Sequence, residues 1–155
     1  MKRVRATLEA AGITPDIRET ALARTAQDAA TALGCAVDQI AKSIVLRGED
    51  SGKALLFVTA GAQQIDLARA SALALAGEAL GKAEAALIRA QTGFAIGGVA
   101  PVGHITPPRA WFDRSLLKFP LVWAAAGTPH HVFSLDPQKM AELSDAQVSD
   151  FVAIS

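Results

Sequence analysis

A lysine and a glycine-rich segment are the parts of this chain whose residue types and spacing could do chemistry. Lys42 stands in the amphipathic run 39–46, where its ammonium can be held against an anionic or carbonyl oxygen. Residues 97–104 read Gly-Gly-Val-Ala-Pro-Val-Gly-His, and glycines at this density let backbone N–H groups approach a ligand closely. Together the two features predict a ligand pocket.

Each feature also has an ordinary structural explanation. The stem of Lys42 could be buried while its charged head stays in solvent, and Gly97 and Gly98 could adopt positive φ in a tight connection stiffened by Pro101. The spacing is neither the Gly-x-Gly-x-x-Gly of a dinucleotide-binding loop nor the Gly-Lys-Ser/Thr of a Walker loop. Three glycines and a proline within residues 97–103 favour a ligand loop over a plain connector.

The histidines and the single cysteine allow fewer roles. His104 closes the glycine-rich segment and could carry a proton or donate a hydrogen bond, or it could be a hydrogen-bonded loop residue without a part in the chemistry. His130 and His131 would point to opposite faces of a strand, which argues against joint ligation of a metal. Cys35 excludes an internal disulfide and is interpreted as a core residue. We therefore expect no metal and no other cofactor.

Composition predicts one domain covering residues 1–155. With 51% apolar residues the chain can bury a substantial core, and its 15 basic residues balance its 15 acidic ones. Because there is no net charge, any RNA contact must be local, and a DNA partner is not expected. The apolar stretches are too short to span a bilayer, so we expect a cytoplasmic protein without a membrane partner.

Hydrophobic periodicity predicts short helices interleaved with at least six short strands. The expected strands cover residues 13–20, 43–47, 54–60, 94–96, 111–113, 121–126 and 131–135. The expected helices are a short opening one that ends before Gly12, and others over 26–33, 67–76, 82–90 and 137–143, followed by a turn over 144–152. Helix caps are expected at Thr25, Asp66, Asp113 and Asp136. The fold class that follows is a single α+β domain with a mixed, mostly antiparallel central sheet flanked by short helices.

Four segments in a fixed order resemble a known family. They are Thr25-Ala-Gln-Asp-Ala-Ala, Gln39-Ile-Ala-Lys-Ser-Ile-Val, Gly93-Phe-Ala-Ile-Gly-Gly-Val-Ala-Pro-Val-Gly-His and Trp123-Ala-Ala-Ala-Gly-Thr-Pro. This combination resembles the YbaK/EbsC family, which is similar to the editing insertion domain of bacterial prolyl-tRNA synthetase. The resemblance extends from about residue 4 to residue 143.

The resemblance implies a free-standing trans-editing enzyme that hydrolyses the ester bond of a mischarged aminoacyl-tRNA. It implies that Lys42 is the key functional residue and that the segment from Gly97 to Pro101 borders the substrate pocket. The substrate-binding positions that it implies are Ser43, Gly97, Gly98, Pro101, His104 and Gly127. The substrate it implies is tRNA-Pro, or another tRNA, carrying a small amino acid such as alanine, cysteine, serine or threonine.

Elementary chemistry agrees with this activity. The leaving group of an aminoacyl ester is a ribose hydroxyl, so a positioned water and a stabilised oxyanion can suffice without a metal or a covalent nucleophile. Two alternatives stay open. One is a non-catalytic module that binds a nucleotide or tRNA, and the other is a regulatory subunit that acts only with an aminoacyl-tRNA synthetase partner.

Overall fold

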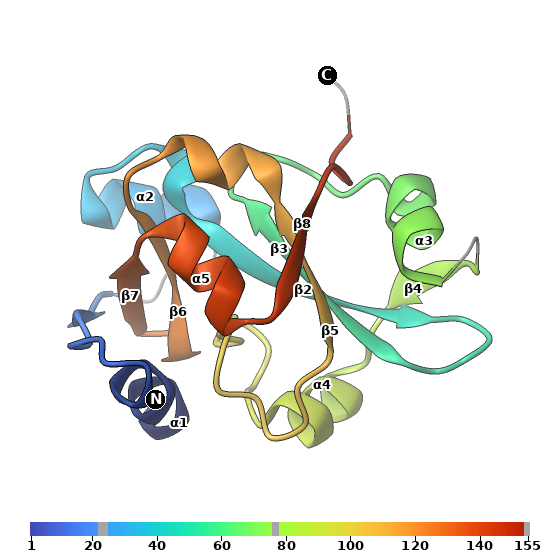
Figure 1. Ribbon diagram of the computed structural model, residues 1–155, viewed down its shortest axis with the longest axis horizontal. Helices are drawn as coiled ribbons and strands as arrows, with labels where there is room; N and C mark the ends of the chain where they lie inside the picture. The colour runs from blue at the N-terminus through green and yellow to red at the C-terminus, as the bar shows by residue number, and fades with distance from the viewer. Residues whose placement is uncertain (22–24, 76–77, 154–155) are drawn as a thin grey trace.

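The apolar runs of the chain pair into two sheets. The structure is a computed structural model that describes residues 1–21, 25–75 and 78–153. The strand order is β4-β2-β3-β5-β8 in the larger sheet and β1-β7-β6 in the smaller one (Figure 1). The larger sheet contains β2 (Ala41–Gly48), β3 (Ala54–Ala60), β4 (Leu80–Lys82), β5 (Arg109–Asp113) and β8 (Ala146–Ser149). The smaller sheet contains β1 (Ile17–Glu19), β6 (Val122–Thr128) and β7 (His131–Leu135).

The pairing confirms the α+β class with a mixed sheet. β2 is antiparallel to β3 and β4, whereas β5 is parallel to both β3 and β8. The smaller sheet is antiparallel throughout. The strands thus divide between two sheets. β7 pairs with β6 on one side and with β1 on the other, so the backbone hydrogen bonds of these three strands are made among themselves. A single bridge between Ile40 and Trp123 links the start of β2 to β6.

Short helices flank both sheets, and their caps follow the sequence predictions. Thr25 accepts from the N–H of Asp28 at the start of α2, which ends at Gly34 in the left-handed conformation. Asp66, Asp113 and Asp136 likewise accept from the N–H groups of the turns that follow them. The helices are α1 (Lys2–Ala10), α2 (Ala26–Leu33), α3 (Leu67–Leu75), α4 (Ala85–Thr92), α5 (Pro137–Leu143) and the 3-10 helices η1 (Val37–Gln39) and η2 (Arg114–Lys118).

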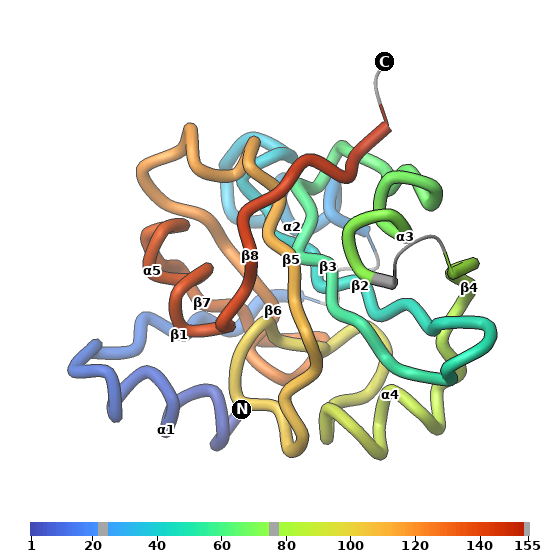
Figure 2. The backbone as a smooth tube through the Cα atoms, turned by 45° about the vertical axis from the view of Figure 1, so that its right-hand side comes forward, coloured from blue at the N-terminus to red at the C-terminus, as the bar shows by residue number. Residues whose placement is uncertain are grey.

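No helix in the described part of the chain has the length and apolar content that a membrane crossing needs. The predicted end of the third helix, residue 76, lies outside the described residues. In Figure 2, α3 lies beside the short edge strand β4.

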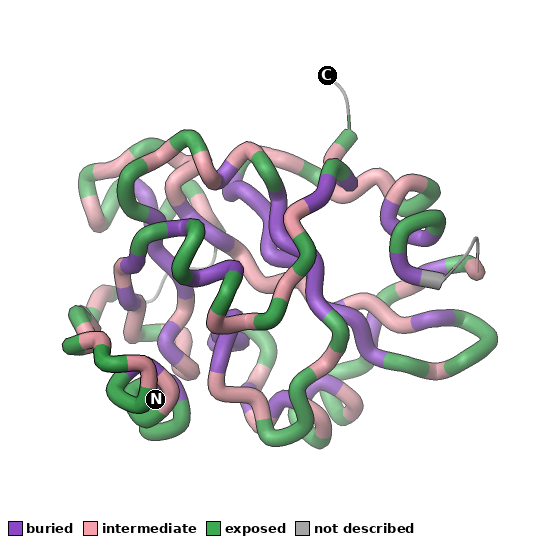
Figure 3. Tube along the Cα trace, viewed as in Figure 1, coloured by how far each residue is buried: buried purple, intermediate pink, exposed green. Residues whose placement is uncertain are grey.

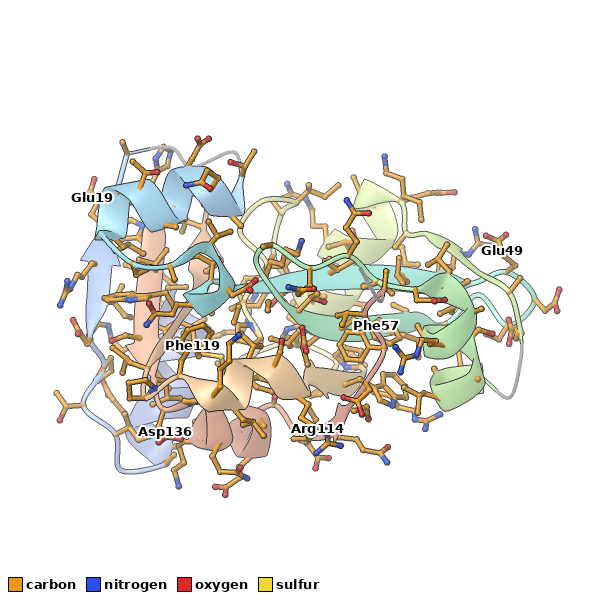
Figure 4. All side chains as sticks on the ribbon, turned by 90° about the horizontal axis from the view of Figure 1, so that it is seen from above. Glu19, Glu49, Phe57, Arg114, Phe119 and Asp136 are labelled. Atoms are coloured by element: carbon orange, nitrogen blue, oxygen red, sulfur yellow. The ribbon has the colours of Figure 1, made fainter. Side chains whose placement is uncertain are left out.

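The core is built on both faces of β3, which is buried along its whole length (Figure 3). Phe57 points to one face, where its ring stacks on Trp111 at a centroid distance of 5.1 Å and meets the edge of Phe151 (Figure 4). Leu56 and Val58 point to the other face, into the larger apolar cluster. A strand buried on both faces gives a rigid platform for its neighbour β2.

Three element predictions were wrong. Residues 94–96 form no strand, since Phe94 is buried in the core while Ile96 is exposed in a turn. The helix expected over 82–90 begins only at Ala85, because residues 80–82 pair with β2 as a strand. The turn expected over 144–152 contains β8, which pairs with β5. In each case a tertiary contact outweighed the local pattern.

Candidate active site

A cavity of about 680 Å³ opens where the first residues of β2 lie beside β6, near the bridge that links the two sheets. Its wall consists mostly of small apolar residues. They come from the start of α2, from β2, from the glycine-rich segment and from β6 and β7. Lys42, Ser43 and Gly97 line it together. A concave apolar site with a few polar groups is the usual form of a small-ligand site.

Lys42 supplies the one ammonium group among the described wall residues. The side chain is half-buried, and its Nζ donates a hydrogen bond of 2.7 Å to the main-chain oxygen of Gln63. No carboxylate in the described residues lies within ion-pair distance of Lys42. Burial lowers the pKa of Lys42, and the negative charges of Asp38 and Asp113 oppose this shift. Since an ammonium has three N–H donors, two remain for a ligand.

The glycine-rich segment contributes Gly97 and Val99 to the wall. Gly97 has φ +89°, and a Cβ atom there would meet no other group within 4 Å. Gly98, by contrast, does not have the positive φ that was expected. It is needed because the segment packs against β6, where a Cβ atom would lie 2.9 Å from the Cα of Thr128. The Gly98 N–H is engaged by the Ala95 carbonyl.

Two residues of this segment that line the cavity have backbone N–H groups without an acceptor among the described residues. In the described part of the chain, the N–H groups of Gly97 and Val99 donate to no protein acceptor, and both residues line the cavity.

Pro101 and His104 lie on the other side of the segment, where they line a second cavity of about 200 Å³. The Nε2 of His104 lies 2.6 Å from the carbonyl of Ala100, and because a carbonyl only accepts, Nε2 carries the ring proton. The ring meets Phe94 edge-on at 5.5 Å. Burial lowers the pKa of His104, with a smaller contribution from the charge of Arg3. In this position His104 stabilises the conformation of the glycine-rich segment through its hydrogen bond to Ala100.

Ser43 and Gly127 differ in their relation to the cavity. The Oγ of Ser43 is buried in its wall and has no hydrogen-bond partner among the described residues. Gly127 lies behind the wall with φ +99°, and a Cβ atom there would lie 2.5 Å from the backbone nitrogen of Met1. Its neighbour Thr128, rather than Gly127, lines the cavity.

The comparison with protein families decides the identity. The model of the aminoacyl-tRNA editing domain matches residues 20–143, which include every site residue discussed above except Met1 and Arg3. This chain belongs to the aminoacyl-tRNA editing domain family. The YbaK/EbsC resemblance is thereby confirmed, and aminoacyl-tRNA is the substrate that an editing domain implies.

Individual relatives of this editing domain agree in sequence and fold. The uncharacterized protein YwhH of Bacillus subtilis (strain 168) is 34% identical over 125 residues, which are 80% of this chain and 77% of YwhH. A crystal structure of a candidate trans-editing enzyme for prolyl-tRNA synthetase is 43% identical, with a TM-score of 0.89 over 99% of this chain and 96% of that one. A hypothetical protein of known structure is 25% identical, with a TM-score of 0.87 over 97% and 99% of the two chains.

Sequence reasoning about this editing domain missed one polar pair. Thr128 and His131 both line the cavity, and Thr128 Oγ1 lies 2.7 Å from Nδ1 of His131. The same hydroxyl also accepts from the N–H of His130 at 3.2 Å, so Thr128 contacts both residues of the histidine pair. The sequence contained the histidine pair, but only shared metal ligation had been considered for it. The described residues hold no cluster of three potential metal ligands.

Proposed function

We propose that this editing domain hydrolyses the ester bond of a mischarged aminoacyl-tRNA and acts in trans. The observation that carries the proposal is the environment of Lys42. Its half-buried ammonium is not neutralised by an acid within ion-pair distance in the described residues, and it shares the cavity with the free N–H groups of Gly97 and Val99. Partial burial of a charge without a neutralising acid is costly, and groups in such environments cluster at functional sites.

The chemistry needs positioning more than reactivity. Water attacks the ester carbonyl and gives up a proton, and negative charge develops on the carbonyl oxygen. The bond to the ribose oxygen then breaks, and that oxygen takes up a proton in place of the one that the water released. The N–H groups of Gly97 and Val99 are suited to the developing oxyanion. Lys42 would hold the terminal adenosine or its phosphate, and its charge would also stabilise the transition state. No step in this scheme requires a metal, so chelator-treated protein should retain its activity.

The size and polarity of the wall support a substrate with a small amino-acid side chain. Alanines at positions 26, 29, 41, 124 and 125 leave room for a small side chain beside the terminal nucleoside. An ester of alanine, cysteine, serine or threonine fits this space, and the similarity to the candidate trans-editing enzyme for prolyl-tRNA synthetase favours tRNA-Pro as the carrier. The balanced charge of the chain is consistent with contacts restricted to the acceptor end of the tRNA.

The test is a panel of tRNAs mischarged with alanine, cysteine, serine or threonine. We expect the wild-type protein to deacylate at least one of them selectively. With Lys42→Ala, the mischarged tRNA should lose its amino acid only at the uncatalysed background rate. Lys82→Ala, which changes an exposed lysine of β4, serves as the matched control. If the mischarged tRNAs are deacylated only at the background rate by both wild type and Lys42→Ala, with and without added prolyl-tRNA synthetase, the protein is a binding module and the proposal is wrong.

A further inference from the structure

The oxygen atom that holds Lys42 belongs to a turn, and that turn is itself held by a carboxylate. Gln63 follows β3, and its N–H closes the turn by donating to Ala60 at 2.9 Å. Asp38 of η1 reaches this turn with both oxygens. Its Oδ1 accepts from the N–H of Ala62 at 2.9 Å, and its Oδ2 accepts from the side-chain amide of Gln63 at 3.3 Å.

The same turn is packed against η1 at backbone distance. A Cβ atom added to Gly61 would lie 2.2 Å from the main-chain oxygen of Val37, so only glycine allows this approach. η1 is anchored in turn by Gln39, whose side chain accepts from the N–H of Ala36 and donates to the carbonyl of Leu121. The Gln63 carbonyl is therefore part of a rigid unit that includes Asp38.

Asp38 also acts on Lys42 through its charge. Asp38 on η1 and Asp113 at the end of β5 are the two carboxylates in the described residues whose charges oppose the effect of burial on Lys42. Asp113 already accepts hydrogen bonds from the N–H of Ala60 and from Ser115. Asp38 is half-buried and is the member of the pair that also orients the carbonyl partner of Lys42.

We propose that Asp38 is a positioning residue for Lys42, because its carboxylate fixes the turn whose Gln63 carbonyl orients the ammonium. Asp38 does not line the cavity, so it acts through Lys42 and not on the substrate. The effect on catalysis rests on the proposed function, whereas the effect on the protonation of Lys42 does not.

The test compares Asp38→Asn with Asp66→Asn. Asp66 is the matched control, since it is also half-buried and its carboxylate accepts from the N–H groups of Ala68 and Arg69, away from Lys42. For Asp38→Asn we expect kcat to fall about tenfold with KM changed less than about twofold. The alkaline limb of its pH–rate profile should move to lower pH, because an acid that raised the pKa of Lys42 has been removed. Asp38→Glu should keep the charge and restore the position of that limb.

A second readout needs no substrate. The titration of Lys42 is followed by NMR in the isolated protein, and its midpoint should be lower in Asp38→Asn than in wild type or Asp66→Asn. An unchanged midpoint in a folded Asp38→Asn variant would overturn the inference. Wild-type protein that deacylates none of the mischarged tRNAs would instead overturn the proposed function, while the NMR titration would still decide the role of Asp38.

Discussion

The ammonium nitrogen of Lys42 lies 2.7 Å from the main-chain oxygen of Gln63, so among the described residues this lysine is held by a neutral carbonyl and not by an acid. A carbonyl orients an ammonium without neutralising it. The positive charge is thus kept available at the cavity wall, at the cost of partial desolvation.

Replacing Lys42 by methionine should separate activity from stability. We expect kcat/KM for deacylation to fall about 100-fold or more, the usual effect of removing a group that stabilises a developing oxyanion. The melting temperature should stay within about 2 °C of wild type or rise, because a half-buried charge is replaced by an apolar chain of similar length. Single-turnover deacylation and thermal unfolding measure the two effects. Lys82→Met should change neither, and a large loss of stability in Lys42→Met would instead assign the lysine a structural role.

The activity should decline at alkaline pH. Burial lowers the pKa of Lys42 from its ordinary value of 10.5, so the ammonium loses its proton at a lower pH than an exposed lysine does. Catalysed deacylation is therefore expected to fall as the pH rises through this lowered pKa, although spontaneous ester hydrolysis rises. The measurement is kcat/KM against pH after subtraction of the uncatalysed rate. A net rate that keeps rising with pH would contradict a role for protonated Lys42.

Two glycines with similar backbone conformations should respond differently to alanine. Gly97 has φ +89° and Gly52, in the β2–β3 hairpin, has φ +71°, and a Cβ atom would meet no other group within 4 Å at either site. Each substitution should therefore cost about 1–2 kcal/mol of unfolding free energy from backbone strain alone. Only Gly97→Ala should also lower kcat/KM, because Gly97 lines the cavity. Urea unfolding and deacylation rates are measured for both variants. Equal kcat/KM for Gly97→Ala and Gly52→Ala would show that the glycine-rich segment is not part of the active site.

Replacing His104 by phenylalanine should lower stability and leave the chemistry largely intact. The buried Ala100 carbonyl loses its partner, which should cost about 1–3 kcal/mol. kcat should stay within about threefold of wild type, because His104 faces the second cavity. Loss of activity in a variant that remains folded would show that this stabilisation of the segment is itself required.

The same variant should remove a pH dependence of stability. Burial lowers the pKa of folded His104 below its ordinary value of 6.5, so below about pH 6.5 the unfolded chain binds more protons than the folded one. The stability that comes from neutral His104 is thus present above pH 6.5 and is lost as the pH falls through the folded-state pKa. Urea unfolding at about pH 5 and about pH 7.5 should show a smaller difference in His104→Phe than in wild type. An identical difference in both proteins would contradict this.

Local features of the fold could be predicted well from the sequence. The caps at Thr25 and Asp136 and the left-handed stop at Gly34 depend on hydrogen bonds between residues a few positions apart. The apolar run 54–60 likewise predicted a strand, and the structure adds that this strand, β3, is buried along its whole length. The errors at residues 94–96 and 144–152 fall where a distant strand or core contact decides the conformation.

The candidate site shows the same division. Residue types and their spacing pointed to Lys42, in the run 39–46, and to the glycine-rich segment. The sequence could not show that Gly98 is needed for contact with Thr128, that His104 faces away from the main cavity, or that Thr128 and His131 form a pair in its wall.

By itself, then, the sequence determined the local elements, the family and the chemical groups available, because these depend on residue types and short-range spacing. Only the tertiary structure decided which of those groups meet. The partner of Lys42 is 21 residues further along the chain, and Asp38 reaches the same turn from the segment before β2. Such contacts depend on how two sheets and a 3-10 helix pack in three dimensions, and no pattern along the chain records that packing.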